Sequence, residues 1–298
     1  MMLIKRVTFT LIILFVFTIV AKAQNKIPFS KKVYLLEDTL KMLGKRLVNG
    51  EDEVERKNAN YAFIKKLVAL LKTPNSFNFP FDSVKTMSIV TDPGKKFRIF
   101  TWHVANNDKT CRFYGAIQVY NIQKLELYPL TDRSDDILTP ADSTLKPEKW
   151  YGAQYYKLIP GGDKTKPHFI LLGWKGNTAK TTKKVIEVFR FVNGKPVFGA
   201  DVFVYKTKTP KRIIFEFNAQ VNMLLRHLPE KNWIVFDHLA LNNVKAATSV
   251  AENYGPDLSY DALKFVGSKW TLMENIDLRN EKSAMDALFI DPKDKNLK

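Results

Sequence analysis

The strongest constraint on the fold is a pair of strand-like segments that flank the dipeptide Asn193-Gly194. Residues 184–192 and 196–205 are rich in β-branched and aromatic side chains. A two-residue type I′ turn needs a positive φ at both central positions, which Asn and Gly tolerate. The sequence therefore predicts a β-hairpin. Three similar segments are predicted to extend it into one antiparallel sheet: residues 168–174, 212–218 and 233–239.

Further strand-like segments lie before and after this region. In residues 97–104, alternation puts Phe100, Trp102 and Val104 on one face. Short turns between residues 84 and 129 favour antiparallel pairing, and residues 262–273 read as another hairpin around Gly267. The predicted fold class is therefore mainly β, with antiparallel sheets in a meander or sandwich.

Residues 31–72 instead carry the spacing of amphipathic helices. Leu36, Leu40, Leu43 and Leu47 recur at intervals of four, three and four, which places them on one helical face. Asn49-Gly50 is typical of a helix end, and the acidic residues that follow suit the start of a second helix. We therefore predict a helical hairpin and linker over residues 24–80, and a β-rich domain over 81–298 with a candidate subdivision at 132–148.

The first 23 residues read as a secretory signal peptide. Lys5 and Arg6 precede an apolar run from Val7 to Val20, and Ala21-Lys22-Ala23 offers a cleavage site. The run is shorter than the roughly 20 residues of a comfortable membrane span, although an uncleaved anchor is the alternative. No second long apolar run follows, so no transmembrane segment is expected after cleavage, and the location is periplasmic or secreted.

The chain is strongly basic and has one cysteine. Loss of Lys5, Arg6 and Lys22 would lower the formal net charge from +17 to +14. In an exported chain such charge favours an anionic glycan or an envelope protein as partner and argues against nucleic acid. Scattered lysines that only aid solubility are the alternative, because no compact basic run occurs. Cys111 has no intramolecular disulfide partner and reads as a buried, inert thiol.

The best candidate for an anion site is a lysine-rich segment with one tryptophan. Its ligand-binding candidates are Trp174, Lys175, Lys180, Lys183 and Lys184. The segment lacks the spacing of a phosphate-binding loop, and a solvated turn whose lysines protect a sheet edge would have the same composition.

Catalytic and metal motifs are weak. Glu187, Glu216, Asp237 and His238 are the acid–base candidates if strands bring them together. Asp257, Ser259 and Asp261 match positions one, three and five of a calcium-binding loop. Ala262 and Ser268, however, occupy positions six and twelve, where such a loop needs Gly and Glu. An Asx-turn explains the same residues. No cofactor motif is present, and none is expected.

Several C-terminal segments resemble a family of uncharacterised exported bacterial proteins. They are residues 171–188, 196–199, 214–221, 234–239 and 255–261. The resemblance covers about the C-terminal half and implies an envelope or secreted location, with no activity to carry over. The sequence thus favours a non-enzymatic binding or structural module, and a hydrolase acting on an envelope or extracellular polymer is the alternative.

Overall fold

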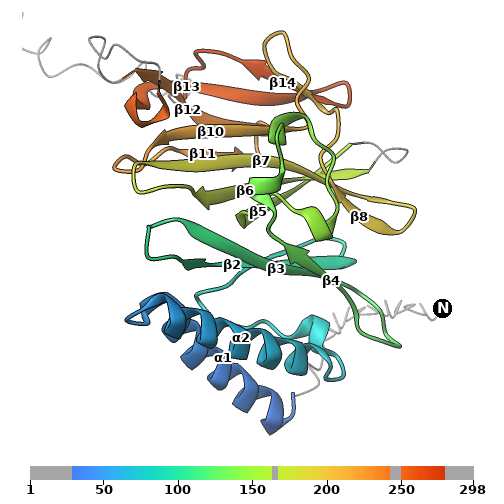
Figure 1. The fold of residues 1–298 in the computed structure, drawn as a ribbon. Helices are drawn as coiled ribbons and strands as arrows, with labels where there is room; N and C mark the ends of the chain where they lie inside the picture. Colours follow the sequence, from blue (N-terminus) through green and yellow to red (C-terminus); the bar gives the residue numbers. More distant parts are fainter. Residues whose placement is uncertain (1–28, 163–166, 242–249, 279–298) are drawn as a thin grey trace, which may run out of the picture.

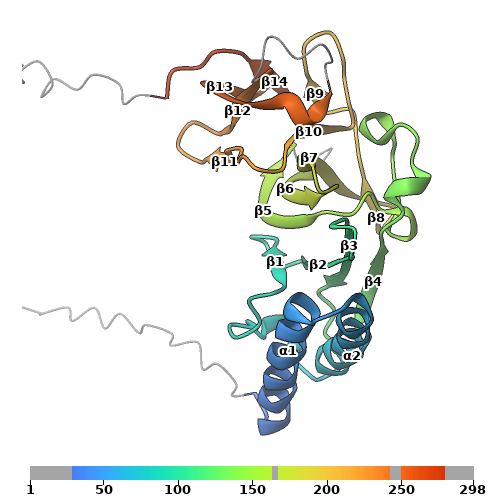
Figure 2. The same cartoon turned by 60° about the vertical axis from the view of Figure 1, so that its left-hand side comes forward.

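The computed structural model describes residues 29–162, 167–241 and 250–278. A helical hairpin and three β-sheets stack as four layers, with the hairpin at the bottom of Figure 1 and the third sheet at the top. Figure 2 shows the same order of layers from another side. Three hydrophobic clusters fill the spaces between successive layers. The predicted mainly β class with an N-terminal helical hairpin is confirmed.

The helical hairpin comprises α1 (Lys31–Asn49) and α2 (Glu53–Leu71). Leu40 and Leu47 are fully buried, as their spacing predicts. The carboxylate of Asp52 caps α2 by accepting a hydrogen bond of 2.7 Å from the backbone N–H of Glu55. Neither helix, nor any other in the described residues, combines the length and apolar character needed to cross a membrane.

The first sheet is a four-stranded meander in the order β1-β2-β3-β4. Its strands are β1 (Ser88–Thr91), β2 (Phe97–Ala105), β3 (Cys111–Val119) and β4 (Glu126–Thr131). The predicted alternation in β2 is confirmed, because Phe100, Trp102 and Val104 pack against the helices while Phe97 and Ile99 face the second sheet. The helical hairpin and the first sheet therefore share one core.

The second sheet has the order β10-β7-β6-β5, and β8 pairs with β7. Its strands are β5 (Gln154–Gly161), β6 (His168–Gly176), β7 (Thr181–Val192), β8 (Lys195–Phe198) and β10 (Arg212–Asn218). Asn193 and Gly194 have φ angles of 50° and 74°, so the predicted hairpin turn is confirmed.

The third sheet has the order β11-β12-β13-β14-β9. Its strands are β9 (Phe203–Val204), β11 (Leu225–Leu228), β12 (Trp233–Leu241), β13 (Tyr254–Val266) and β14 (Lys269–Met273). Two expectations were wrong here. Residues 233–239 lie in this sheet and not beside the central hairpin. The segment 196–205 is not one strand, because it breaks at Gly199 and crosses from the second sheet to the third.

Gly199 explains that break. Its φ of 89° lies in the left-handed region, and a Cβ at this position would lie 2.7 Å from the carbonyl oxygen of Ser143. Only glycine allows the chain to turn at this close approach. Beyond the turn, β9 pairs in parallel with β14.

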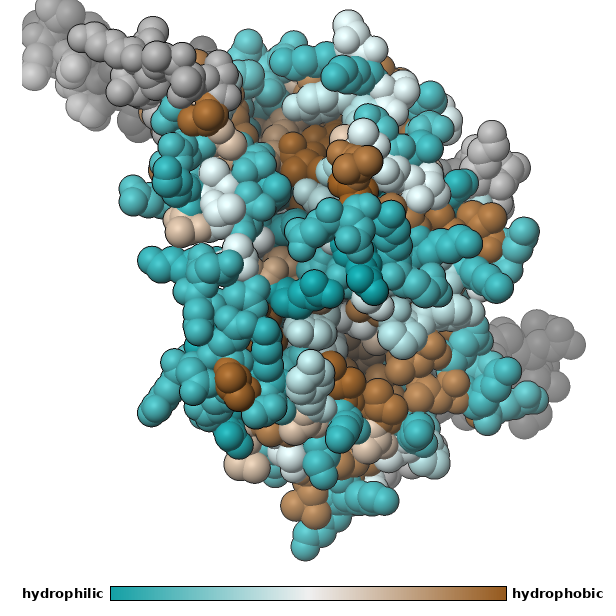
Figure 3. Space-filling view, in the orientation of Figure 1, coloured by the Kyte–Doolittle hydropathy of each residue, from teal (hydrophilic) through white to brown (hydrophobic). Residues whose placement is uncertain are grey.

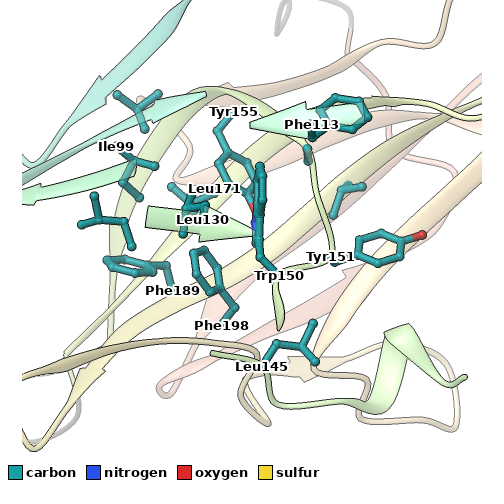
Figure 4. Close-up of a cluster of buried hydrophobic side chains, with 14 of the residues drawn as sticks. Ile99, Phe113, Leu130, Leu145, Trp150, Tyr151, Tyr155, Leu171, Phe189 and Phe198 are labelled. Atoms are coloured by element: carbon teal, nitrogen blue, oxygen red, sulfur yellow. The ribbon is translucent and has the colours of Figure 1, made fainter. Parts of the chain in front are cut away.

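The polar interval 132–148 connects the first and second sheets. It contains the 3₁₀ helices η2 (Ser134–Asp136) and η3 (Pro140–Asp142) and leads into η4 (Pro147–Lys149); two more, η1 (Ser76–Asn78) and η5 (Ala251–Asn253), lie elsewhere. Ile137 and Leu145 are buried in the cluster between the two sheets. Figure 4 shows Leu145 near Phe198 and Trp150 in this cluster. The interval thus contributes to a core that both sheets share.

Candidate functional site

A polar pocket of about 450 Å³ opens where the first and second sheets meet at one end. The end of β6, the start of β7, the start of β3 and the η2 turn bring its walls together. The charged lining residues are Asp108, Arg112, Asp132, Asp135, Lys175 and Lys183, and the neutral polar ones include Asn106, Thr110, Ser134 and Asn177. Cations and carboxylates are therefore mixed in one cavity.

Lys175 is the most deeply buried cation of this pocket. Only 5% of the residue is exposed. Its Nζ donates a hydrogen bond of 2.7 Å to the Ser134 hydroxyl, and it lies 4.7 Å and 4.9 Å from the ring centres of Phe113 and Tyr151. Figure 4 shows the Tyr151 ring turned away from the centre of the hydrophobic cluster. No ion pair of the described residues involves Lys175, so aromatic faces and one hydroxyl hold this cation.

Ser134 connects Lys175 to a buried carboxylate. Its hydroxyl lies 2.5 Å from Oδ1 of Asp132 and also contacts the carbonyl oxygen of Tyr151. Asp132 additionally accepts backbone hydrogen bonds from Phe113 and Ser134, at 3.0 Å and 3.1 Å. Because a hydroxyl has one proton, Ser134 donates to one of its acceptors while its oxygen accepts from the ammonium group. The Ser134 hydroxyl therefore lies between the ammonium of Lys175 and the carboxylate of Asp132, which do not contact each other directly.

Burial lowers the pKa of Lys175 to about 8. The carboxylates of Asp132 and Asp135 oppose this shift, and the nearby ammonium of Lys183 adds to it. The cause is desolvation, since removal from water disfavours the charged form. Lys175 is thus mostly charged at pH 7 and loses its proton just above it.

Lys183 lies directly opposite Lys175 across the β6–β7 pair. Its Nζ is 3.2 Å from Oε2 of Glu216, and Oε1 of Glu216 accepts hydrogen bonds from Asn177 and Thr181, at 2.9 Å and 2.8 Å. Glu216 therefore neutralises Lys183 and fixes the turn between the two strands. Among the residues that the structure describes, Lys175 is therefore the one of the two opposed lysines that makes no ion pair with a carboxylate.

The structure places four of the five predicted ligand-binding residues in two cavities, and the fifth, Lys180, lines neither of them. Lys175 and Lys183 line the pocket described above, whereas Trp174 and Lys184 line a neighbouring cavity of about 250 Å³. Successive side chains of a strand alternate between the faces of a sheet, which explains the division. Trp174 packs against His103 with ring centres 4.9 Å apart, and Lys184 lies 5.1 Å from the Tyr156 ring centre. Lys180 is exposed and pairs with Glu252.

The four acid–base candidates do not meet in one cleft of the described residues. Glu187 and Glu216 both lie in the second sheet, on neighbouring strands. Glu187 of β7 is opposite Arg212 of β10, whereas Glu216 of β10 is opposite Lys183, four residues from Glu187 along β7. Four residues along a strand separate these positions by about 13 Å, beyond the spacing of glycosidase carboxylates. In the third sheet, His238 contacts Asp261 at 2.8 Å, and Asp237 accepts the backbone N–H of Leu224 at 2.7 Å.

The calcium candidates also have other partners. Asp257 accepts hydrogen bonds from the backbone N–H and the hydroxyl of Ser259, at 3.0 Å and 2.7 Å, which is an Asx-turn. Asp261 is buried and bonds to His238 and to the backbone N–H of Asn275. Within the described ranges, no group of three or more His, Cys, Asp or Glu side chains is arranged to hold a metal ion.

Ser134, Asp132 and Tyr151, which surround Lys175, are among the pocket residues that the sequence did not predict. For Asp132 and Ser134 the one available signal was the unusual polarity and length of the interval 132–148, and Tyr151 lies outside that interval. Cys111, which also lines the pocket, is partly buried, and burial raises the pKa of its thiol. That shift agrees with an unreactive cysteine.

We expect Gly152→Ala to destabilise the protein by about 2 kcal/mol or more. Gly152 has a φ of 73°, and a Cβ here would lie 2.6 Å from the Asp132 carboxylate. Gly194→Ala is the matched control, because its φ is 74° with nothing within 4 Å of the added Cβ. It should cost about 1 kcal/mol from the backbone alone. Urea unfolding measures both, and equal losses would contradict the close contact at Asp132.

Comparisons with known proteins found no relative of this chain. No family model matches the chain, and neither a curated protein nor a solved structure matches it.

Proposed function

We propose that the chain is an exported binding module of the bacterial envelope, and that the pocket at Lys175 receives an anionic group of a glycan. The observation that carries this proposal is the buried ammonium of Lys175, which has no direct carboxylate partner in the described residues. An isolated buried cation is costly, and a ligand carboxylate would offset that cost.

The remaining lining favours a ligand that carries both a charge and hydroxyl groups. Arg112 is exposed at the pocket and can attract an anion from solution. Asn106, Thr110 and Asn177 supply neutral donors and acceptors suited to sugar hydroxyls. Asp108 and Asp135 disfavour a densely charged polyanion. A uronic acid residue, with one carboxylate and several hydroxyls, fits this mixture better than a sulfated chain.

Calorimetric titration of residues 24–298 tests the proposal. The ligands are a uronic-acid trisaccharide and a neutral trisaccharide of the same linkage, each at low and at high salt. We expect saturable, salt-sensitive binding of the acidic sugar alone. At a hundredfold excess over Kd it should also stabilise the fold by about 2.7 kcal/mol. Equal binding of both sugars, or of neither, would refute the proposal.

One observation favours a hydrolase as the second candidate. Ser134 and Lys175 lie within hydrogen-bond distance, at 2.7 Å, as in hydrolases with a serine nucleophile and a lysine base. Lys175 would have to be neutral to accept the proton of Ser134, and Asp132 competes for that proton. A serine-reactive phosphonate distinguishes the two functions, because covalent labelling at Ser134, located by mass spectrometry, requires a nucleophile, whereas a binding pocket leaves it unmodified.

A further inference from the structure

We propose that one end of the first sheet docks onto an anionic phospholipid surface. The end is formed by η1 and by the turns that join β1 to β2 and β3 to β4. We call it the tip surface, and it comprises Phe77, Lys95, Lys96, Tyr120, Ile122 and Lys124. It belongs to the first sheet and shares no residue with the pocket at Lys175.

The tip surface presents apolar side chains to solvent. Ile122 is 86% exposed in the β3–β4 turn, and Tyr120 is 50% exposed beside it. The Tyr120 ring packs edge-on against Phe77, with ring centres 5.1 Å apart. One exposed apolar residue is ordinary, but an aliphatic tip beside a tyrosine suits the boundary between lipid and water. Figure 3 shows a group of apolar side chains beside the right-hand part of the helical hairpin, with mainly hydrophilic side chains farther to the right.

Lysines surround these apolar residues. Lys95, Lys96 and Lys124 are exposed, and no ion pair of the described residues involves them. The carboxylate in the β1–β2 turn, Asp92, is buried and accepts the backbone N–H of Lys96. Lys95, Lys96, Tyr120 and Phe77 also line a hollow of about 400 Å³ that can seat a phosphate headgroup. Each lysine near an anionic membrane strengthens binding about fivefold.

The charge and the side-chain types of the tip surface favour a lipid occupant over a protein partner. Its three exposed lysines, which make no ion pair in the described residues, complement lipid phosphates. Ile122 protrudes beside Tyr120, and an aliphatic side chain next to a tyrosine suits the boundary between headgroups and acyl chains.

Co-sedimentation of residues 24–298, which include every described residue, with lipid vesicles tests this inference. Vesicles of phosphatidylcholine alone are compared with vesicles containing one-third phosphatidylglycerol. We expect binding to the anionic vesicles only, weakened by salt. The pair Lys95→Glu and Lys96→Glu should weaken it roughly 30-fold or more, and Ile122→Asp should weaken it at every salt concentration.

The third sheet offers matched controls, because it is the layer farthest from the tip surface (Figure 1). Lys264→Glu with Lys269→Glu makes the same change in net charge at exposed positions, and Leu258→Asp replaces an apolar residue that is 89% exposed. Both controls should bind within about threefold of the unaltered chain. If the control and tip variants lost vesicle binding equally, net charge alone would explain the binding and the inference would be overturned. Absence of binding to anionic vesicles would also overturn it, as would a tip that instead forms dimers in a mass measurement.

Discussion

Glu187→Ala is expected to lower the free energy of unfolding by about 3–5 kcal/mol. Glu187 and Arg212 are both fully buried, and Oε2 of Glu187 lies 2.8 Å from Nε of Arg212. Burial raises the pKa of Glu187, and the adjacent guanidinium opposes that shift. Removal of the carboxylate leaves an uncompensated buried cation. Urea unfolding at pH 7 measures the loss.

Arg212 also explains why the loss should extend beyond the pair itself. Its Nη1 donates to the carbonyl oxygens of Ser143, at 3.1 Å, and of Pro140. The guanidinium lies 5.7 Å from the Tyr151 ring centre. These contacts hold the interval 132–148 onto the second sheet. We therefore expect Glu187→Ala both to lower the urea midpoint of unfolding and to loosen the interval 132–148, which forms one wall of the Lys175 pocket.

Two controls separate this structural role from a catalytic one. Glu187→Leu combined with Arg212→Met removes both charges and should cost less than Glu187→Ala alone. Glu216→Gln alters a partly exposed ion pair with Lys183 and should change stability by about 1 kcal/mol or less. A Glu187→Ala protein with unchanged stability would contradict the buried pair and restore Glu187 as an acid–base candidate.

Local patterns predicted most of the fold because each depends on residues close in sequence. The helical hairpin follows from the leucine spacing in residues 36–47, and the central turn follows from the need of Asn193 and Gly194 for positive φ. Alternation in β2 predicted correctly which side chains share a face, and the structure shows that this face packs against the helices. Burial on one face of an element leaves a signal in its own sequence.

The division into three sheets left no such signal. Strands 212–218 and 233–239 have similar composition, yet they lie in different layers because the chain leaves the second sheet after Asn218. The break at Gly199 depends on a carbonyl oxygen at Ser143, far away in sequence. The site was only partly predictable for the same reason. Lys175 was one of five candidates in its lysine-rich segment, and its partner Ser134 lies 41 residues away in an interval without strand pattern.

Lys175→Met is expected to weaken binding of the uronic-acid trisaccharide about 100-fold without lowering the stability of the fold. Loss of a buried charged donor that meets a ligand charge costs about 3 kcal/mol of binding free energy. Methionine fills similar space beside Phe113 and Tyr151. Asp132 keeps its hydrogen bonds from Ser134 and from the backbone of Phe113. Titration calorimetry and urea unfolding measure the two quantities.

The pH dependence distinguishes a charged lysine from one that only shapes the pocket. Because Lys175 has a pKa of about 8 in the folded chain, below its ordinary 10.5, affinity for the acidic sugar should fall as pH rises through about 8. Over the same range the unfolded chain binds more protons than the folded one, so this group makes stability rise between about pH 8 and 10.5. Lys175→Met should abolish both the fall in affinity and the rise in stability with pH. Lys180→Met, at an exposed lysine paired with Glu252, should leave both intact. If affinity in the unaltered chain is constant from pH 7 to 9.5, the ammonium of Lys175 does not contact the ligand.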